Sequence, residues 1–275
     1  MIIILQSRHP NLQSIRGKMS REALLIDIDG VLYVGDHPVP GAREAIARLD
    51  DAGYRYRFLS NTTRKCRKTI AARLNKMGFA IDQDRLFTPA IAAVRYLHER
   101  GVRSCHLLTT GDVNRDFEEA GIQHEDDAAC LVIGDAGDEF TYGRMNRVFR
   151  LTLGNAGFVA LERDRYWMGA DGLMLGAGPF VAALEYATGK EAILVGKPSP
   201  SFFMLALQDM DARPEESVMV GDDIATDIKG AKTFGLRAVL VKTGKYRPET
   251  LSAADVRPDF VIRSIAGIDE VLGGR

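Results

Sequence analysis

The chain has 275 residues, and 46% of them are hydrophobic, which is enough for one large domain or for two smaller domains with hydrophobic cores. Its 36 Lys and Arg residues nearly balance its 37 Asp and Glu residues, so the formal net charge is -1. This balance gives no electrostatic reason to expect nucleic acid or an anionic membrane as a partner, and it favours a small molecule.

The N-terminal residues 1–18 contain an apolar run of only four residues after Met1 and no small-residue cleavage site. The run is too short to span a bilayer, and we expect a flexible extension before Met19. No later stretch reaches membrane length. The three cysteines, at positions 66, 105 and 130, show no paired metal-ligand spacing, so we expect reduced thiols in a cytoplasmic protein.

The first hundred residues alternate between strand and helix patterns. Residues 23–28 form a nearly continuous apolar run, which predicts a strand buried on both faces and followed by Asp29 and Gly30. The elements expected next are a helix opened by Pro40 and Gly41 and stopped by Gly53, a strand over 54–60, a helix over 64–77, a short apolar segment around Leu86, and a helix with Thr88 as N-cap and Pro89 as first residue.

A second series of elements begins near Gly101. It comprises a strand over 104–110, a helix opened near Asp112, a strand over 129–134, a helix ending near Leu153, further short strands, a helix over 179–188, a buried strand over 192–196, a helix over 200–210, a strand over 217–221, a helix over 224–234 and a strand over 237–241. Strands that alternate with helices predict an α/β fold with a Rossmann-like, doubly wound parallel sheet.

Four short polar segments follow predicted strands, and the carboxyl ends of parallel strands meet at one edge of an open sheet. The first segment is DIDGVL, residues 27–32. Its two carboxylates, Asp27 and Asp29, reach one centre only if the chain turns after Asp27, and Gly30 permits such a turn. An acidic turn on a solvated strand end explains this pair equally well.

The second segment is LSNTT, residues 59–63, and the third is VGKPS, residues 195–199. The hydroxyl of Ser60 and a backbone or side-chain N–H of Asn61 are suitable donors to a phosphoryl oxygen, although such residues are also ordinary in turns. Lys197 offers a compact cation that can neutralise phosphate, although a lysine at a strand end is commonly a solvated surface group.

The fourth segment is VGDDIATDIKGA, residues 220–231. Asp222, Asp223 and Asp227 crowd the junction between a strand and a helix, and so many carboxylates in one place indicate a cation. Hard oxygen ligands select Mg²⁺. The alternative is that Asp222 or Asp223 caps the helix while Asp227 is exposed. Four segments of the right chemistry, all at strand ends, favour a functional site over four separate structural explanations.

The order DxDG, Ser-Asn, Lys-Pro and GDDxxxD resembles the haloacid dehalogenase-like superfamily, and the match covers almost the whole chain after Met19. The segments over 171–190 and 241–246 resemble its subfamily IIA, which has a large α/β cap of the C2 type. The resemblance implies a magnesium-dependent phosphatase that hydrolyses small phosphorylated metabolites, whether phosphomonoesters, phosphoramidates or pyrophosphate.

The same resemblance implies roles for the motif residues. Asp27 would attack phosphorus to give an aspartyl-phosphate, and Asp29 would protonate the leaving oxygen and then activate water. Ser60 and Asn61 would bind the phosphoryl group, and Lys197 would steady both that group and the nucleophile. The implied Mg²⁺ ligands are Asp27, the backbone carbonyl of Asp29, and Asp222, with support from Asp223 or Asp227.

The motif spacing shows where the chain carries an insertion. Asp29 and Ser60 are 31 positions apart (60 − 29), whereas Ser60 and Lys197 are 137 apart (197 − 60). In the family, an insertion at this place is the α/β cap, which implies a catalytic core over 19–100 and 191–275 and a cap over 101–190. We expect Tyr166 and Trp167 in this insertion to serve packing.

Two other functions fit the same motifs. One is a phosphoryl transferase or mutase of the same fold, and the other is a weakly active phosphate-binding scaffold. The family also implies a homodimer formed through the cap. From the balanced charge we expect no nucleic acid or membrane partner.

Overall fold

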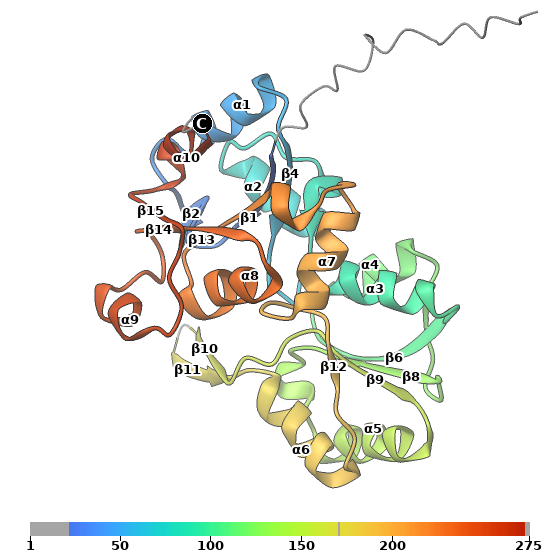
Figure 1. Cartoon of the computed structure of the whole chain (residues 1–275). Helices are drawn as coiled ribbons and strands as arrows, with labels where there is room; N and C mark the ends of the chain where they lie inside the picture. The colour runs from blue at the N-terminus through green and yellow to red at the C-terminus, as the bar shows by residue number, and fades with distance from the viewer. Residues whose placement is uncertain (1–21, 170, 273–275) are drawn as a thin grey trace, which may run out of the picture.

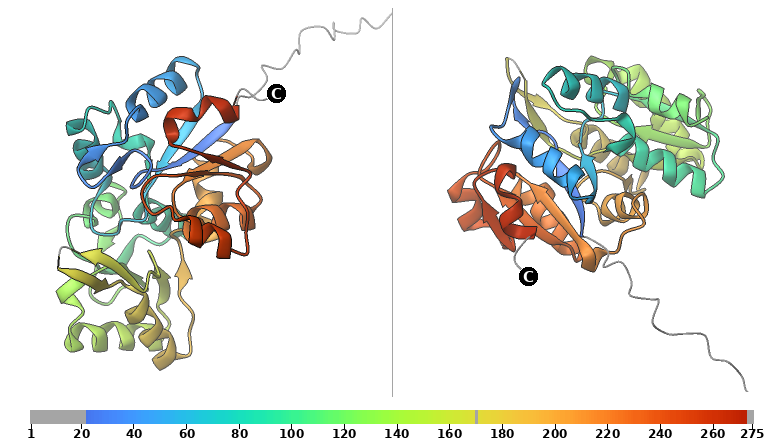
Figure 2. Two further views of the ribbon diagram at one scale, coloured as in Figure 1. Left: turned by 90° about the vertical axis from the view of Figure 1, so that its left-hand side faces the viewer. Right: turned by 90° about the horizontal axis from the view of Figure 1, so that it is seen from above.

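The computed structural model describes residues 22–169 and 171–272, so the extension expected over residues 1–18 lies outside the described part. Two parallel sheets, each with its own helices, form a larger and a smaller lobe (Figures 1 and 2). Among the described residues, no helix is both long and apolar enough to cross a membrane.

The larger sheet has six strands in the order β15-β14-β13-β1-β4-β5, and all its neighbouring strands are parallel. All five residues of its central strand β1 are buried, as expected for an apolar run that is covered on both faces. The strands are β1 (Ala23–Asp27), β4 (Arg55–Leu59), β5 (Leu86–Phe87), β13 (Ser217–Gly221), β14 (Arg237–Val241) and β15 (Phe260–Ile262).

Helices cover both faces of this sheet. One face packs against α1 (Ala42–Asp51), α2 (Arg67–Lys76) and α10 (Asp269–Leu272). The other face packs against α3 (Pro89–Glu99), α7 (Pro200–Gln208) and α8 (Lys229–Phe234). The predicted doubly wound α/β fold is therefore confirmed. Thr88 is the N-cap of α3, because its hydroxyl accepts the N–H of Ile91 at 3.4 Å.

The smaller sheet has five strands in the order β12-β9-β8-β6-β7, and its neighbouring strands are also parallel. One face packs against α5 (Tyr142–Gly154) and α6 (Gly178–Thr188), and the other against α3 and α4 (Asn114–Glu119). The strands are β6 (Ser104–Leu108), β7 (Gln123–His124), β8 (Cys130–Ile133), β9 (Gly157–Ala160) and β12 (Ile193–Leu194).

Two small hairpins and one further helix lie beside the two sheets and the helices that cover them. The hairpins pair β2 (Tyr33–Val34) with β3 (His37–Pro38) and β10 (Tyr166–Gly169) with β11 (Gly172–Leu175). The helix α9 (Pro248–Ala253) follows β14. The β10–β11 hairpin projects from the smaller lobe toward α8 and α9 (Figure 1).

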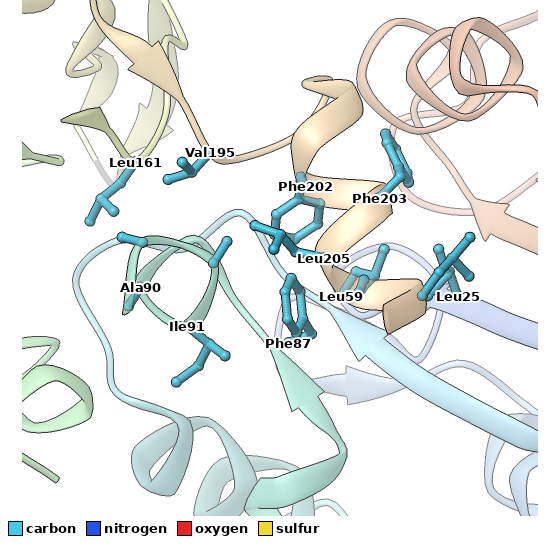
Figure 3. Close-up of a cluster of buried hydrophobic side chains, with 14 of the residues drawn as sticks. Leu25, Leu59, Phe87, Ala90, Ile91, Leu161, Val195, Phe202, Phe203 and Leu205 are labelled. Atoms are coloured by element: carbon cyan, nitrogen blue, oxygen red, sulfur yellow. The ribbon is translucent and has the colours of Figure 1, made fainter. Parts of the chain in front are cut away.

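One hydrophobic cluster joins the two lobes (Figure 3). Phe202 of α7 lies against Phe87 of β5, with their ring centroids 5.3 Å apart. Leu161 and Val195, which adjoin strands of the smaller sheet, belong to the same buried cluster. Because helix α3 also contributes to it, the packing of one lobe continues into the other.

The structure differs from the sequence predictions at two places. The buried strand predicted over 192–196 was wrong, because the strand has only the residues of β12, lies at the edge of the smaller sheet and leaves Ile193 40% exposed. The helix predicted over 224–234 begins with one π-helical turn, Ile224–Ile228, before α8.

Candidate active site

The four polar segments meet at the carboxyl edge of the larger sheet. They line one cleft of about 660 Å³ that the smaller lobe borders on its other side. Segments 27–32, 59–63 and 220–231 follow the neighbouring strands β1, β4 and β13, so the order of the sheet brings them together. All eight residues singled out in the sequence line this cleft: Asp27, Asp29, Ser60, Asn61, Lys197, Asp222, Asp223 and Asp227.

Lys197 is a buried cation between two carboxylates. Its Nζ donates a hydrogen bond to Asp27 and another to Asp227, the latter at 2.8 Å. Burial alone lowers the pKa of an amine, but the attraction of Asp227 and Asp27 outweighs it and holds the pKa of Lys197 above its usual value. The lysine is therefore charged in the cleft, with its charge directed at Asp27.

Three buried carboxylates surround this one lysine. Oxygen atoms of Asp27, Asp222 and Asp227 lie within 4.8 Å of one another. Burial raises the pKa of Asp222 to about 7, and repulsion from Asp227 adds to the rise. Burial also raises the pKa of Asp27 well above its usual range, with Lys197 opposing and the other two carboxylates adding to the rise. The cluster has an excess of negative charge, and hard oxygen ligands of this kind fit Mg²⁺.

The two remaining acidic residues have different surroundings. Asp223 caps the turn that follows β13, because its Oδ1 accepts the N–H groups of Ala225 and Thr226 at 2.9 and 3.2 Å. The capping alternative therefore applies to Asp223, whereas Asp227 is 1% exposed rather than solvated. The side chain of Asp29 is exposed at the cleft, so it is accessible to water and to a bound molecule.

A glycine allows the first and fourth segments to approach each other. Gly30 has a φ of +88°, and a Cβ atom there would lie 1.9 Å from Oδ2 of Asp222. The loop after β14 supports the contact, because the N–H of Lys245 donates to the same carboxylate oxygen at 2.6 Å and the hydroxyl of Thr243 donates to the carbonyl of Gly30 at 2.5 Å. The sequence reasoning assigned no role to these two loop residues.

The second and third segments are joined by Asn61. Its Oδ1 accepts the backbone N–H of Lys197 at 2.9 Å, and its Nδ2 donates to the carbonyl of Lys197 at 3.2 Å. The neighbouring Ser60 hydroxyl accepts the N–H of Thr62 at 3.2 Å, which leaves its own proton to donate into the cleft.

The chain matches two known family descriptions. Residues 24–123 match "Haloacid dehalogenase-like hydrolase", and residues 194–268 match a second description of hydrolases like the haloacid dehalogenases. The chain belongs to the haloacid dehalogenase-like hydrolase family. The resemblance seen in the sequence, and the hydrolase class that it implies, are therefore confirmed.

Relatives within the family match nearly the whole chain. The chain is 44% identical to haloacid dehalogenase-like hydrolase domain-containing protein 2 of Mus musculus, over 91% of this chain and 96% of that protein. It is 40% identical to phospholysine phosphohistidine inorganic pyrophosphate phosphatase of Xenopus laevis, over 91% of this chain and 94% of that protein. The branch of the family suggested by the segments over 171–190 and 241–246 is thus confirmed.

Solved structures share the fold of this hydrolase. NagD from E. coli superposes with a TM-score of 0.83 at 27% identity and covers 91% of this chain and 99% of its own. The p-nitrophenyl phosphatase from Archaeoglobus fulgidus gives a TM-score of 0.85 at 27% identity and covers 92% and 99%. Glycerol phosphate phosphatase from Mycobacterium tuberculosis, solved in complex with magnesium, gives 0.78 at 26% identity and covers 90% and 75%.

The sequence reasoning missed the residues through which the smaller lobe of this hydrolase borders the cleft. They are Asp135, Glu162, Asp164, Trp167 and Met168. Arg64, from the loop after β4, reaches across to them: its guanidinium donates to Asp135 at 2.9 Å and lies 5.1 Å from the ring centre of Trp167. The packing role expected for Trp167 is therefore incomplete, because this ring also forms part of the cleft wall.

A second cluster with metal-ligating atoms lies outside the cleft, at the edge of the smaller sheet. Ligand atoms of His106, His124 and Asp126 lie within 4.8 Å of one another. Both imidazoles already contact backbone groups. Nδ1 of His124 accepts the N–H of Leu107 at 3.0 Å, and Nδ1 of His106 lies 3.2 Å from the carbonyl oxygen of Asp126. We therefore assign this cluster a structural role in holding the sheet edge.

Proposed function

We propose that the protein is a magnesium-dependent phosphatase that hydrolyses small phosphorylated metabolites through an aspartyl-phosphate on Asp27. The observation that carries this proposal is the contact of Asp27 with the charged Lys197, at the buried end of a cleft that also holds Asp222 and Asp227. Relatives named as phosphatases, including one that acts on p-nitrophenyl phosphate, support it.

In the proposed reaction, a carboxylate oxygen of Asp27 attacks phosphorus, and the bond from phosphorus to the leaving oxygen breaks. Asp29, exposed at the cleft, gives its proton to that leaving oxygen. Asp29 then takes a proton from water, which attacks the phosphorus of the aspartyl-phosphate and breaks its bond to Asp27. Inorganic phosphate leaves, and both carboxyl groups return to their starting state.

The chain's own donors hold the phosphoryl group during both steps. Lys197 lies beside the attacking carboxylate, so its charge offsets the repulsion between Asp27 and an incoming dianion. The hydroxyl of Ser60 and the backbone N–H of Asn61 are the donors that we assign to the phosphoryl oxygens.

The carboxylates of the cleft fit a magnesium ion. The three buried carboxylates carry more negative charge than Lys197 neutralises, and burial raises the pKa values of Asp27 and Asp222. Asp27, Asp222 and the backbone carbonyl of Asp29 would hold the ion. Asp227 would support it, because Lys197 and the N–H of Asp223 already engage its two oxygens. When bound, Mg²⁺ supplies positive charge to the phosphoryl oxygens.

The test replaces the nucleophile. We expect Asp27→Asn to abolish Mg²⁺-dependent hydrolysis of 4-nitrophenyl phosphate, because an amide oxygen is too poor a nucleophile to form the intermediate. Asp255→Asn, at an exposed carboxylate that pairs with Lys229, is the matched control and should keep wild-type turnover. Undiminished turnover in the Asp27 variant would contradict the proposed mechanism. The alternative function has its own test: transfer of the phosphoryl group to a sugar acceptor without release of phosphate would favour a mutase.

We further propose that the segment over 101–190 acts as the cap of a core over 19–100 and 191–275, with strand β12 from the second core segment joining the sheet of the cap. We also propose that the enzyme is cytoplasmic and that it pairs through the cap. A cap over the cleft would restrict access to small substrates. Light scattering of the purified protein tests the dimer. A panel of phosphorylated metabolites that includes a phosphoramidate and pyrophosphate tests the substrate class, which the name of one relative suggests.

A further inference from the structure

Both polar atoms of the Asn61 side chain form hydrogen bonds within the protein. The amide is a two-point clamp on the backbone of Lys197, with one bond to the N–H at 2.9 Å and one to the carbonyl at 3.2 Å. An asparagine amide offers an acceptor oxygen and a donor nitrogen, so the clamp engages both polar atoms of the side chain.

The clamp spans two loops that are 136 residues apart in the chain. Residues 59–63 follow β4, whereas Lys197 follows β12 at the edge of the smaller sheet, so no strand pairing fixes one loop against the other. The site of contact is also tightly packed, since a Cβ atom on Gly196 would lie 2.2 Å from the carbonyl oxygen of Leu161 and 3.0 Å from Oδ1 of Asn61. Asn61 thus fixes the backbone from which the catalytic lysine extends.

We infer that Asn61 is a positioning residue: its side chain places Lys197 against Asp27 and does not bind the phosphoryl group. This inference rests on the proposed function. Within Asn61 it leaves the backbone N–H as the group that donates to phosphate, beside the hydroxyl of Ser60. The Nζ of Lys197 donates to both Asp27 and Asp227, so a shift of the backbone at Lys197 disturbs two contacts at once. A displacement of about 1 Å in such a group lowers rates by about 100-fold.

A double-mutant cycle separates positioning from direct binding. We expect Asn61→Ala to lower kcat/KM for 4-nitrophenyl phosphate by about 100-fold in the wild type and by less than about threefold in a Lys197→Ala background, because a positioning residue has nothing left to position. A side chain that binds phosphate itself would cost a similar factor in both backgrounds. Equal losses in the two backgrounds would therefore overturn the inference.

The chain offers a matched control for loss of the clamp. Asn75 makes the same kind of two-point contact with the backbone of Ile81, at 2.8 and 3.0 Å, and does not line the cleft. Asn75→Ala removes an equal number of side-chain hydrogen bonds, so it shows how much of any loss comes from general destabilisation. We expect its kcat/KM to stay within about twofold of the wild type.

A second measurement does not depend on activity. The backbone amide of Lys197 is protected by its bond to Oδ1 of Asn61, so its hydrogen exchange, followed by nuclear magnetic resonance, should accelerate at least tenfold in Asn61→Ala and stay unchanged in Asn75→Ala. Unchanged protection in Asn61→Ala would overturn the clamp. If the wild type lacked phosphatase activity, the proposed function would fail, while the exchange experiment would still decide whether Asn61 holds Lys197.

Discussion

Glu162 is a buried carboxyl group in the wall of the active-site cleft, contributed by the smaller lobe. Its two oxygens accept the N–H groups of Ala177 at 3.0 Å and Asp164 at 2.6 Å. Burial raises its pKa from 4.5 to about 7, the two backbone donors oppose the rise, and the charges of Asp164 and Asp135 add to it. The folded protein therefore binds a proton at Glu162 at pH values where the unfolded chain has lost it.

The difference between the folded and unfolded pKa values of Glu162 sets how stability depends on pH. A carboxyl pKa that is higher in the folded state makes the free energy of unfolding fall as pH rises from about 4.5 to about 7, by on the order of 3 kcal/mol for this group. We expect Glu162→Gln to lose this part of the dependence. Urea unfolding at intervals between pH 4.5 and 8 measures it, with Glu249→Gln at an exposed site as control. Parallel curves for the wild type and Glu162→Gln would contradict the prediction.

Sequence reasoning located one group of site residues and missed another, for a physical reason. Asp27, Ser60 and Asp222 each follow an apolar run, and the carboxyl ends of such strands meet wherever the sheet is parallel. Glu162 and Arg64 lie in loops whose distance from Asp27 depends on how the two lobes pack. No local pattern carries that information, so a sequence can identify the motifs at the strand ends before it identifies the cleft wall.

Helix α7 contributes Phe202 to the hydrophobic cluster that joins the two lobes. Phe202 is fully buried and lies against Phe87, whereas Phe260 on the edge strand β15 is 40% exposed. We expect Phe202→Ala to lower the free energy of unfolding by about 3–5 kcal/mol, because it removes a buried ring and leaves a cavity between the lobes. Phe260→Ala should cost about 1 kcal/mol or less. Denaturant unfolding measures the free energy of unfolding of both variants. Similar decreases for Phe202→Ala and Phe260→Ala would mean that the cluster in Figure 3 does not link the lobes.

Most elements follow from local patterns, and the two exceptions show where such patterns fail. Strands β1 and β13 are short apolar runs between turn residues, and α3 has both an N-cap and a proline at its start. The run over 192–196 has the same composition as a buried strand, but its strand lies at the edge of the smaller sheet. The position of a strand within a sheet depends on tertiary packing and not on its own composition. The π turn Ile224–Ile228 gives no sequence signal, and it contains the buried Asp227.

The two lobes also contact each other through acidic residues that meet the loop after β4 and the first residue of α2. Asp135 pairs with Arg64, Asp112 accepts the N–H of Cys66 at 2.9 Å, and Asp116 accepts the N–H of Arg67 at 3.1 Å. All three carboxylates come from the smaller lobe, and the loop that they contact continues from Ser60 and Asn61. A shift of the smaller lobe would therefore move the phosphate donors that we assign to this loop.

The stability of the whole molecule should depend on magnesium. A cation that binds only the folded state adds about 2.7 kcal/mol to the free energy of unfolding at a free concentration 100 times its Kd. Without a cation, three carboxylates repel one another around Lys197, and the pKa of Asp222 is raised to about 7. We expect Mg²⁺ to raise the Tm of the wild type above its value in EDTA, and Asp222→Asn to abolish this shift, because the variant lacks a ligand.

The same variant distinguishes loss of a ligand from loss of structure. Asparagine keeps an oxygen that can accept the N–H of Lys245 and removes one negative charge from the cluster, so Asp222→Asn in EDTA should unfold at no lower a temperature than the wild type. Asp255→Asn, at a residue that does not line the cleft, should retain the full magnesium-induced rise in Tm. An equal Mg²⁺-induced rise in Tm for Asp222→Asn and the wild type would show that the cation binds elsewhere. Asp27 would then need another source of positive charge beside Lys197.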